Sequence, residues 1–271
     1  MNEILVLGAT GKTGRRVVSL LQAQGERVRP ASRSSRLRFD WTAPETWREA
    51  VGAAEAVYLV APDDPAPVRK FVQDATGVRR FVVLSGRGMD LVDNGFGAGM
   101  ASAEKAVRDS GAEWTILRPN NFNQNFDEGL WHAPLRAGRL ALPIGQVPEP
   151  FVDADDVAAV AAAALARDGH AGHVYDLAGP DRLTFASAVE VMARAAGRSI
   201  EYVELTPEQY RDELLAEGYP EAAVEALNAQ FELHRAGISA DPADGVRRAL
   251  GRDPIAFADY AARVAATGAW S

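Results

Sequence analysis

An apolar strand that leads into three spaced glycines constrains the fold of this chain more than any other feature. Residues 4–7 read Ile-Leu-Val-Leu, and Gly8, Gly11 and Gly14 follow them. In a strand–turn–helix unit the first glycine permits a tight turn, and the second lets the backbone approach a pyrophosphate. The third lets the helix pack close to the strand. The alternative is an ordinary glycine-rich turn of an α/β protein.

The helix that begins near residue 12 would direct free N–H groups and the positive end of its dipole at the phosphates. The sequence therefore predicts a dinucleotide-binding loop. We expect these residues of the loop to contact the cofactor: Gly8, Thr10, Gly11, Lys12, Thr13 and Gly14.

Strand and helix patterns alternate over the first 120 residues. Apolar strand patterns cover residues 4–7, 27–32, 56–60, 81–84 and 114–117. Strands separated by helices form βαβ units with right-handed crossovers, so the expected fold class is α/β, a Rossmann-like doubly wound parallel sheet. Pro30 is unfavourable for a central strand.

The pattern changes after Pro119, where Asn, Gly and Pro are frequent up to residue 152. Helical patterns then cover residues 156–166, 185–196 and 207–231. We expect residues 1–155 to form the dinucleotide-binding domain. Residues 156–271 would form a smaller C-terminal substrate lobe, interleaved with that domain rather than independent of it.

Composition excludes several kinds of protein. The formal net charge is −8 and no basic stripe occurs, so we expect no nucleic-acid partner. The lack of cysteine excludes disulfides and thiolate catalysis and fits a reducing compartment. No apolar run is long enough to span a bilayer, and the first strand leaves no room for a signal peptide. We expect a cytoplasmic monomer or homodimer with no membrane partner.

The second strand is followed by arginine and serine where NAD-selective folds place an acid. No Asp or Glu occurs between Glu26 and Asp40. Arg33, Ser34 and Arg36 lie in that stretch instead. A guanidinium binds phosphate oxygens in bidentate fashion and stacks on adenine, so NADP(H) is predicted over NAD(H). The alternative is a solvated surface loop. Asp40 could border the adenine.

Ligands of such sheets bind outside the carboxyl ends of the strands. Ala61 and Pro62 follow the third apolar strand, and Ser85 and Gly86 follow the fourth. Asn121 follows the fifth, and its amide could orient both the nicotinamide carboxamide and a substrate. We expect these residues at the nicotinamide half of the cofactor, although Asn is also a common turn residue.

Several segments carry a resemblance. They are Gly-Ala-Thr-Gly-Lys-Thr-Gly at residues 8–14, Ser85-Gly86, Lys105, Trp-Thr-Ile-Leu-Arg-Pro-Asn-Asn-Phe at 114–122 and Phe-Val-Asp-Ala-Asp-Asp-Val-Ala at 151–158. Together they resemble the NmrA-like branch of the atypical short-chain dehydrogenase/reductase superfamily, over about residues 1–180. The stretch that ends in Asn-Gln-Asn-Phe at residue 126 is similar to ergot alkaloid reductases of the festuclavine dehydrogenase type.

The resemblance implies NADPH binding. In the wider superfamily a Tyr-x-x-x-Lys pair acts in catalysis, with Tyr as the proton donor and Lys bound to the ribose. Lys105 matches the lysine, but Ala101 stands where the tyrosine is expected. This departure disfavours ketones and leaves acceptors that need little acid, such as an iminium or a quinone. The alternative is that Lys105 is a surface lysine paired with Glu104 or Asp109.

Three titratable residues are candidates for a replacement proton donor: Asp90, Asp93 and His132. General loop behaviour favours the alternative, that each is a solvated loop residue. Asp90 and Asp93 lie in the glycine-rich segment 86–99, which could close over a substrate.

Aromatic residues could line an apolar substrate pocket. We expect Phe122, Trp131 and Phe151 there, with core packing as the alternative. The acids at 153, 155 and 156 precede an alanine-rich helix, where carboxylates favour free N–H groups, so we expect no metal.

Two functional hypotheses follow. The first is an NADPH-dependent oxidoreductase that delivers hydride to a small, apolar or aromatic, cyclic acceptor of imine, iminium or quinone character. The second is a non-catalytic NmrA-like redox sensor that binds NADP(H) and regulates a partner protein.

Overall fold

The computed structural model describes residues 3–88 and 97–271, which form two compact units. Unit 1 comprises Met1–Pro119, Ala154–Leu177 and Asp244–Asp253. Unit 2 comprises Asn120–Asp153, Ala178–Ala243 and Pro254–Ser271. The chain passes between the units several times. These units differ from the division expected at residue 155, because residues 156–177 pack with the N-terminal sheet.

Unit 1 contains a parallel sheet whose strands follow the order β3-β2-β1-β4-β5-β6-β8. The strands are β1 (Glu3–Leu7), β2 (Arg27–Ser32), β3 (Leu37–Arg38), β4 (Ala54–Val60), β5 (Arg80–Leu84), β6 (Glu113–Pro119) and β8 (His173–Leu177). The strand order reverses between β1 and β4, which is the switch point of a doubly wound sheet. The predicted fold class is confirmed.

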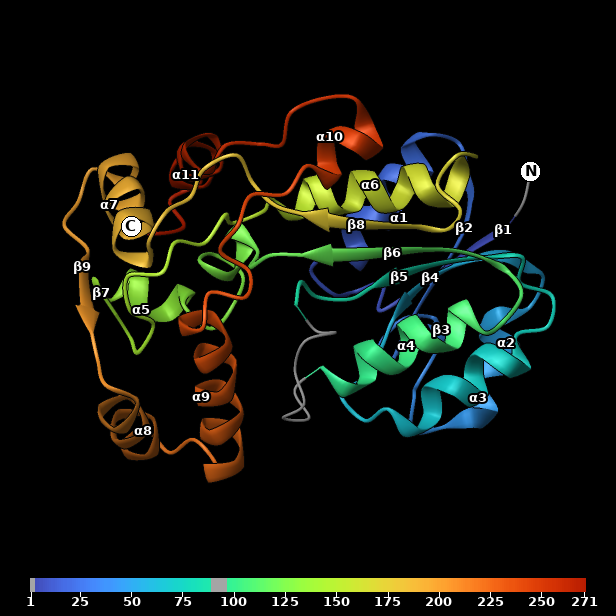
Figure 1. Cartoon of the computed structure of the whole chain (residues 1–271), viewed down its shortest axis with the longest axis horizontal. Coiled ribbons are helices and arrows are strands. Elements are labelled where there is room, and N and C mark those ends of the chain that lie inside the picture. Colours follow the sequence, from blue (N-terminus) through green and yellow to red (C-terminus); the bar gives the residue numbers. More distant parts are fainter. Residues whose placement is uncertain (1–2, 89–96) are drawn as a thin grey trace. The chain divides into compact units, whose positions relative to one another are not determined.

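Helices cover both faces of this sheet. In Figure 1, α1 (Gly14–Ala23), α6 (Ala154–Ala166) and α10 (Gly245–Leu250) lie on one face. On the other face lie η1 (Pro44–Thr46), α2 (Trp47–Val51), α3 (Ala66–Asp74) and α4 (Ala98–Arg108). Strands buried on both faces are apolar throughout, and residues 4–7 of β1 are at most 2% exposed.

Pro30 is tolerated in β2 because of where the neighbouring strands lie. It pairs with Val6 of β1 on one side. On the other side β3 begins its pairing only at Ala31, opposite Leu37. Pro30 therefore occupies a local edge, where its missing N–H leaves no ladder bond unmade.

Unit 2 contains a parallel pair of strands, β7 (Arg139–Leu142) and β9 (Glu201–Glu204). Its helices are η3 (Asn123–Asn125), α5 (His132–Arg136), α7 (Phe185–Ala196), α8 (Pro207–Ala216), α9 (Glu221–Arg235) and α11 (Phe257–Ala265). The predicted helix at 207–231 is interrupted, because Gly218 adopts a positive φ of 88° and Pro220 follows it.

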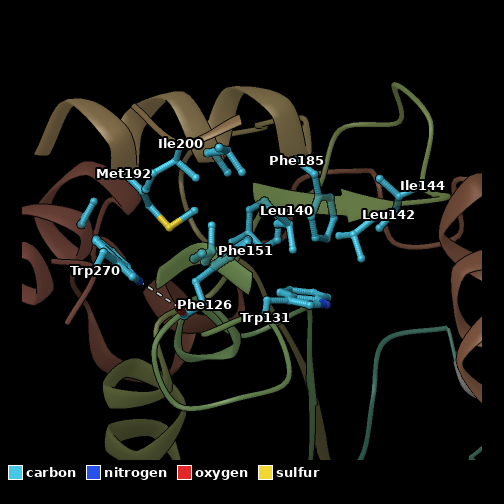
Figure 2. Close-up of a cluster of buried hydrophobic side chains, with 14 of the residues drawn as sticks. Phe126, Trp131, Leu140, Leu142, Ile144, Phe151, Phe185, Met192, Ile200 and Trp270 are labelled. Atoms are coloured by element: carbon cyan, nitrogen blue, oxygen red, sulfur yellow. Dashed lines mark hydrogen bonds between the residues drawn. The ribbon is translucent and has the colours of Figure 1, made fainter. Parts of the chain in front are cut away.

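The core of unit 2 is rich in aromatic rings. Figure 2 shows Phe126 close to Phe151 and Trp131. The centroids of Phe126 and Phe151 are 5.2 Å apart, and those of Phe151 and Phe185 are 4.9 Å apart. Trp270 is fully buried and donates its indole N–H to the carbonyl of Phe126 at 2.9 Å. Within the described ranges, no helix is long and apolar enough to cross a membrane.

Candidate cofactor site

The loop after β1 has the geometry that its three glycines predict. Gly8 adopts a φ of +63°, and the N–H of Gly11 donates to the Gly8 carbonyl at 2.8 Å. A Cβ on Gly14 would lie 2.1 Å from that same carbonyl oxygen, so only glycine allows α1 to start so close to β1. Gly14 therefore provides the close packing of helix and strand that the sequence predicts for the third glycine.

The first turn of α1 presents unpaired backbone N–H groups. Those of Thr13 and Gly14 have no hydrogen-bond acceptor among residues 3–88 and 97–271. The Thr13 side chain is held by Tyr58, whose hydroxyl lies 3.1 Å from Thr13 Oγ1. Burial raises the pKa of Tyr58, so its hydroxyl stays protonated and can donate to Thr13. This turn fits a pyrophosphate, which its dipole also favours.

The loop after β4 lies at the switch point of the sheet, next to the glycine loop that follows β1. Ala61 and Pro62 are half-buried there. A Cβ on Gly99 would lie 1.7 Å from the Pro62 carbonyl oxygen, so the start of α4 approaches the same edge of the sheet. Ala61 and Pro62, which are predicted to lie at the nicotinamide half, therefore follow the carboxyl end of β4, where ligands of such sheets bind.

The loop after β2 contains two exposed arginines, Arg33 and Arg36. Ser32 Oγ accepts from the N–H groups of Ser34 and Ser35 at 3.2 and 3.0 Å, which fixes the turn. Arg33 and Arg36 are exposed, and neither forms an ion pair with any residue that the structure describes. Their guanidinium groups are therefore available to an anion.

Asp40 has a structural role in the geometry observed. Its Oδ1 accepts from the N–H and the hydroxyl of Thr42 at 3.0 and 2.8 Å. These hydrogen bonds, with the nearby Arg38, hold the pKa of Asp40 below its ordinary value. Contact between Asp40 and adenine stays a prediction.

Ser85 is buried at the end of β5 and belongs to a charged cluster. Its Oγ donates to Glu104 Oε1 at 2.7 Å. Arg118 donates to both oxygens of Glu104, at 2.8 and 2.7 Å, and Arg108 donates to Oε2 at 3.1 Å. Burial raises the pKa of Glu104, but these hydrogen bonds and charges outweigh it, and the net pKa is lowered. Ser85 is thus bound to an ionised carboxylate. Gly86 follows it, half-buried.

Lys105 lies on the exposed side of α4. Its side chain is 75% exposed, and its Nζ lies 3.2 Å from the carboxylate of Asp109, one turn further along. Because Gly99 marks the end of α4 nearest the carboxyl edge, this pairing directs the ammonium away from that edge. The observed contact is the surface pairing with Asp109, and a role for Lys105 at the cofactor stays a prediction.

Asn121 is held by its backbone alone. Its N–H donates to Glu149 Oε1 at 3.1 Å, and its carbonyl accepts from the N–H of Val152 at 2.9 Å. Its half-buried side-chain amide has no hydrogen-bond partner in the part of the chain that the structure describes. This amide, two residues beyond β6, is free to bind a ligand.

The structure gives little support to the three residues predicted as proton donors. His132 Nε2 lies 2.8 Å from the carbonyl of Ala269, and a carbonyl only accepts, so that nitrogen carries the proton and is already bound. Asp90 and Asp93, with most of the segment proposed to close over a substrate, lie outside the described residues.

The aromatic residues predicted for a pocket differ in burial. Phe122 is half-buried and bridges to Val152. Trp131 and Phe151 are 6% and 2% exposed and belong to the core of unit 2. Core packing therefore describes their contacts, and a pocket role for them stays a prediction.

The acids that open α6 pair with arginines. Arg16 Nε lies 2.7 Å from Asp155, and Arg252 Nη2 lies 2.7 Å from Asp156. Asp153, just before α6, pairs with Arg263 at 2.8 Å. Among residues 3–88 and 97–271, no three His, Cys, Asp or Glu side chains lie together in a way that could hold a metal ion.

Three residues that organise these sites are not predicted from the sequence: Tyr58, Glu104 and Glu149. The only available signals were a tyrosine inside an aliphatic strand, an acid within an alanine-rich helix and an acid between two prolines. None of these signals identifies a partner, because the partners are distant in sequence.

The fold and the glycine loop define a Rossmann-like dinucleotide-binding protein. The chain belongs to the NmrA-like, NAD(P)H-binding family, because the NAD(P)H-binding profile matches residues 8–168 and the NmrA-like profile matches residues 98–248. The predicted resemblance is confirmed.

The chain is similar to several oxidoreductases over nearly their whole lengths. The uncharacterized oxidoreductase YesF of Bacillus subtilis (strain 168) is 34% identical, over 100% of this chain and 98% of that protein. The NAD(P)H azoreductase of Xenophilus azovorans is 32% identical, over 98% and 99%. Festuclavine synthase I of Penicillium roqueforti (strain FM164) is 28% identical, over 95% and 96%.

Two solved structures share the fold. The NADPH complex of the quinone oxidoreductase QOR2 from Escherichia coli has a TM-score of 0.80 at 21% identity, over 96% of this chain and 99% of that chain. NmrA, a negative transcriptional regulator in complex with NAD, has a TM-score of 0.73 at 18% identity, over 98% and 96%.

Proposed function

We propose that the chain is an NADPH-dependent reductase that delivers hydride to a small apolar or aromatic acceptor, such as a cyclic imine, an iminium or a quinone. The carrying observation is the glycine loop at the switch point, where Gly14 lets α1 begin against the Gly8 carbonyl and the N–H groups of Thr13 and Gly14 have no acceptor among the described residues. The azoreductase and quinone oxidoreductase among its relatives support this acceptor class, since their names describe acceptors that are easily reduced.

NADPH supplies the hydride when bound, and the chain supplies its position. The N–H groups of Thr13 and Gly14 would bind the pyrophosphate, and Arg33 and Arg36 would bind the 2′-phosphate. The free amide of Asn121 would orient the nicotinamide carboxamide or the acceptor.

The acceptor class follows from the groups that could donate a proton. Ala101 supplies no acid, and the Ser85 hydroxyl is bound to the ionised Glu104. A ketone needs a proton as hydride arrives, whereas an iminium carbon already carries positive charge. Water can protonate a reduced quinone after the transfer. We expect ketones to be poor substrates.

The preference for NADPH is tested by replacing Arg33 and Arg36 together with alanine. The dissociation constant of NADPH should rise at least about tenfold, while that of NADH changes less than about twofold, because only NADPH carries the 2′-phosphate. Arg79→Ala is the matched control. This arginine is 80% exposed and directly precedes β5, so it lies at the amino ends of the strands, whereas Arg33 and Arg36 follow the carboxyl end of β2. Equal weakening of both cofactors would contradict the assignment.

Turnover is tested by following NADPH absorbance with a panel of quinones, cyclic imines, azo compounds and ketones. We expect oxidation with acceptors of the first three kinds and little with ketones. The second candidate function is a redox sensor, which the lack of an acid at Ala101 also favours. No turnover across the panel, combined with a clear affinity difference between NADP+ and NADPH, would support the sensor. We propose a cytoplasmic location for either function.

A further inference from the structure

A buried carboxylate in unit 2 is surrounded by donors. Glu149 is 0% exposed. Its Oε1 accepts from Asn120 Nδ2 at 2.7 Å and from the N–H of Asn121 at 3.1 Å. Its Oε2 lies 2.9 Å from His234 Nδ1 and accepts from Ser239 Oγ at 3.1 Å. Each oxygen therefore has two partners, and the partners come from two distant segments, residues 120–121 and 234–239.

The hydrogen-bond geometry makes His234 a cation. Its Nε2 lies 3.1 Å from the carbonyl of Val147, which only accepts, so Nε2 carries a proton. Burial raises the pKa of Glu149, but the bonds from His234 and Asn120 outweigh burial and leave the carboxyl ionised. An ionised carboxylate also only accepts, so Nδ1 carries a second proton. The imidazolium lies in the last turn of α9, where the helix dipole favours a cation.

Stability of the core alone does not account for this ion pair. Well-packed apolar residues usually stabilise a core as well as or better than a buried ion pair, because both charges must leave water. What the pair adds is direction, since a charge-assisted hydrogen bond fixes the atoms on both sides of it. The segment so fixed is Asn120–Asn121, directly after β6.

We propose that the Glu149–His234 ion pair is a positioning device that fixes where Asn121 presents its free amide to the bound nicotinamide or acceptor. The pair binds the Asn121 N–H, and Val152 binds its carbonyl, so the backbone is held from both sides. The inference rests on the proposed function of Asn121 at the cofactor. Glu149 and His234 are positioning residues and touch no reacting atom.

The test is a double-mutant cycle between Glu149→Gln and Asn121→Ala, read as kcat at saturating NADPH. The first substitution keeps the shape of the side chain and removes its charge. The second keeps the backbone N–H and removes only the side-chain amide. We expect Glu149→Gln to lower kcat about tenfold in the wild-type background, since small misplacements are costly in catalysis. In the Asn121→Ala background it should change kcat less than about twofold.

Equal losses in both backgrounds would show that Glu149 acts only on stability and would overturn the proposal, as would unchanged kcat in Glu149→Gln. The control is Glu213→Gln, which breaks an exposed pair with Arg139 in the same unit and should leave kcat unchanged. If circular dichroism shows that Glu149→Gln does not fold, Ser239→Ala replaces it. That variant removes one donor to Oε2 and should lower kcat about threefold, again only when Asn121 is present.

The wild-type protein separates this inference from the proposed function. If it binds NADPH without turnover, the reductase assignment fails, and the same cycle is then read in the dissociation constant of NADPH. Coupling of at least about threefold in that constant supports the positioning role, and additive effects overturn it.

Discussion

Gly14 is the residue at which a single atom decides whether the cofactor loop can form. A Cβ there would lie 2.1 Å from the Gly8 carbonyl oxygen, and the atoms it would meet are all backbone. No side-chain rotation can relieve such a contact. The loop must move instead, which displaces the N–H groups that would bind the pyrophosphate.

We therefore predict that Gly14→Ala raises the dissociation constant of NADPH at least about tenfold, because the α1 N-terminus is displaced from the phosphates. Fluorescence titration of NADPH measures the change. Gly77→Ala is the matched control in the same unit, since a Cβ at Gly77 meets nothing within 4 Å. An unchanged constant in Gly14→Ala would place the dinucleotide elsewhere.

Among the elements of unit 1, α4 is joined to the ends of β5 and β6 by charge. Glu104 of α4 binds Ser85 after β5 and Arg118 of β6. This contact fixes the helix that also approaches Pro62 through Gly99. It therefore holds together the segments that border the carboxyl edge of the sheet.

Glu104→Gln should lower the free energy of unfolding by about 3 kcal/mol at pH 7, because it leaves buried arginine charge without a partner. The folded-state pKa of Glu104 lies below its ordinary value of 4.5, so this stabilisation is complete above about pH 4.5 and is lost as the pH falls through the lowered value. Urea unfolding at several pH values should show the difference between wild type and variant shrink in acid.

A surface pair provides the comparison for Glu104. Glu113→Gln removes one of two acidic partners of Arg80, since Asp168 also pairs with it, at a site where Glu113 is 50% exposed. It should cost less than about 1 kcal/mol. A pH-independent gap between wild type and Glu104→Gln would refute the ionised state of Glu104.

At the scale of the whole molecule, the two units have separate apolar cores. The core of unit 1 lies between helices and a parallel sheet. The core of unit 2 consists largely of aromatic side chains from segments that are distant in sequence. Trp270 illustrates the second kind, since it is fully buried and bonded to Phe126, 144 residues earlier. Long-range contacts of this kind hold unit 2 together.

Trp270→Ala should destabilise the protein by about 3 to 5 kcal/mol, through the lost burial, the cavity and the unpaired carbonyl of Phe126. Thermal unfolding followed by circular dichroism measures this loss. Leu130→Ala is the control, because Leu130 is 42% exposed and its truncation should change stability by less than about 0.5 kcal/mol. Equal melting temperatures for the two variants would contradict the core assignment.

Local features were readable from the sequence alone. The glycine loop, the alternating strands and helices, and the family resemblance all depend on neighbouring residues, so they were predicted. The break at Gly218–Pro220 and the short strand β7 were missed, because a pattern of periodic apolar residues locates element interiors better than their ends.

The sequence by itself determined the fold class, the family and the position of the phosphate loop, because close backbone approach at fixed intervals requires glycine and nothing else. Only the tertiary structure decided which polar side chains are already bound to another residue and which are not. It bound Ser85 to Glu104, paired Lys105 with Asp109, and left the amide of Asn121 free beside the buried pair of Glu149 and His234. These assignments join residues up to 85 positions apart, and a hydrogen bond depends on distance in space rather than in sequence.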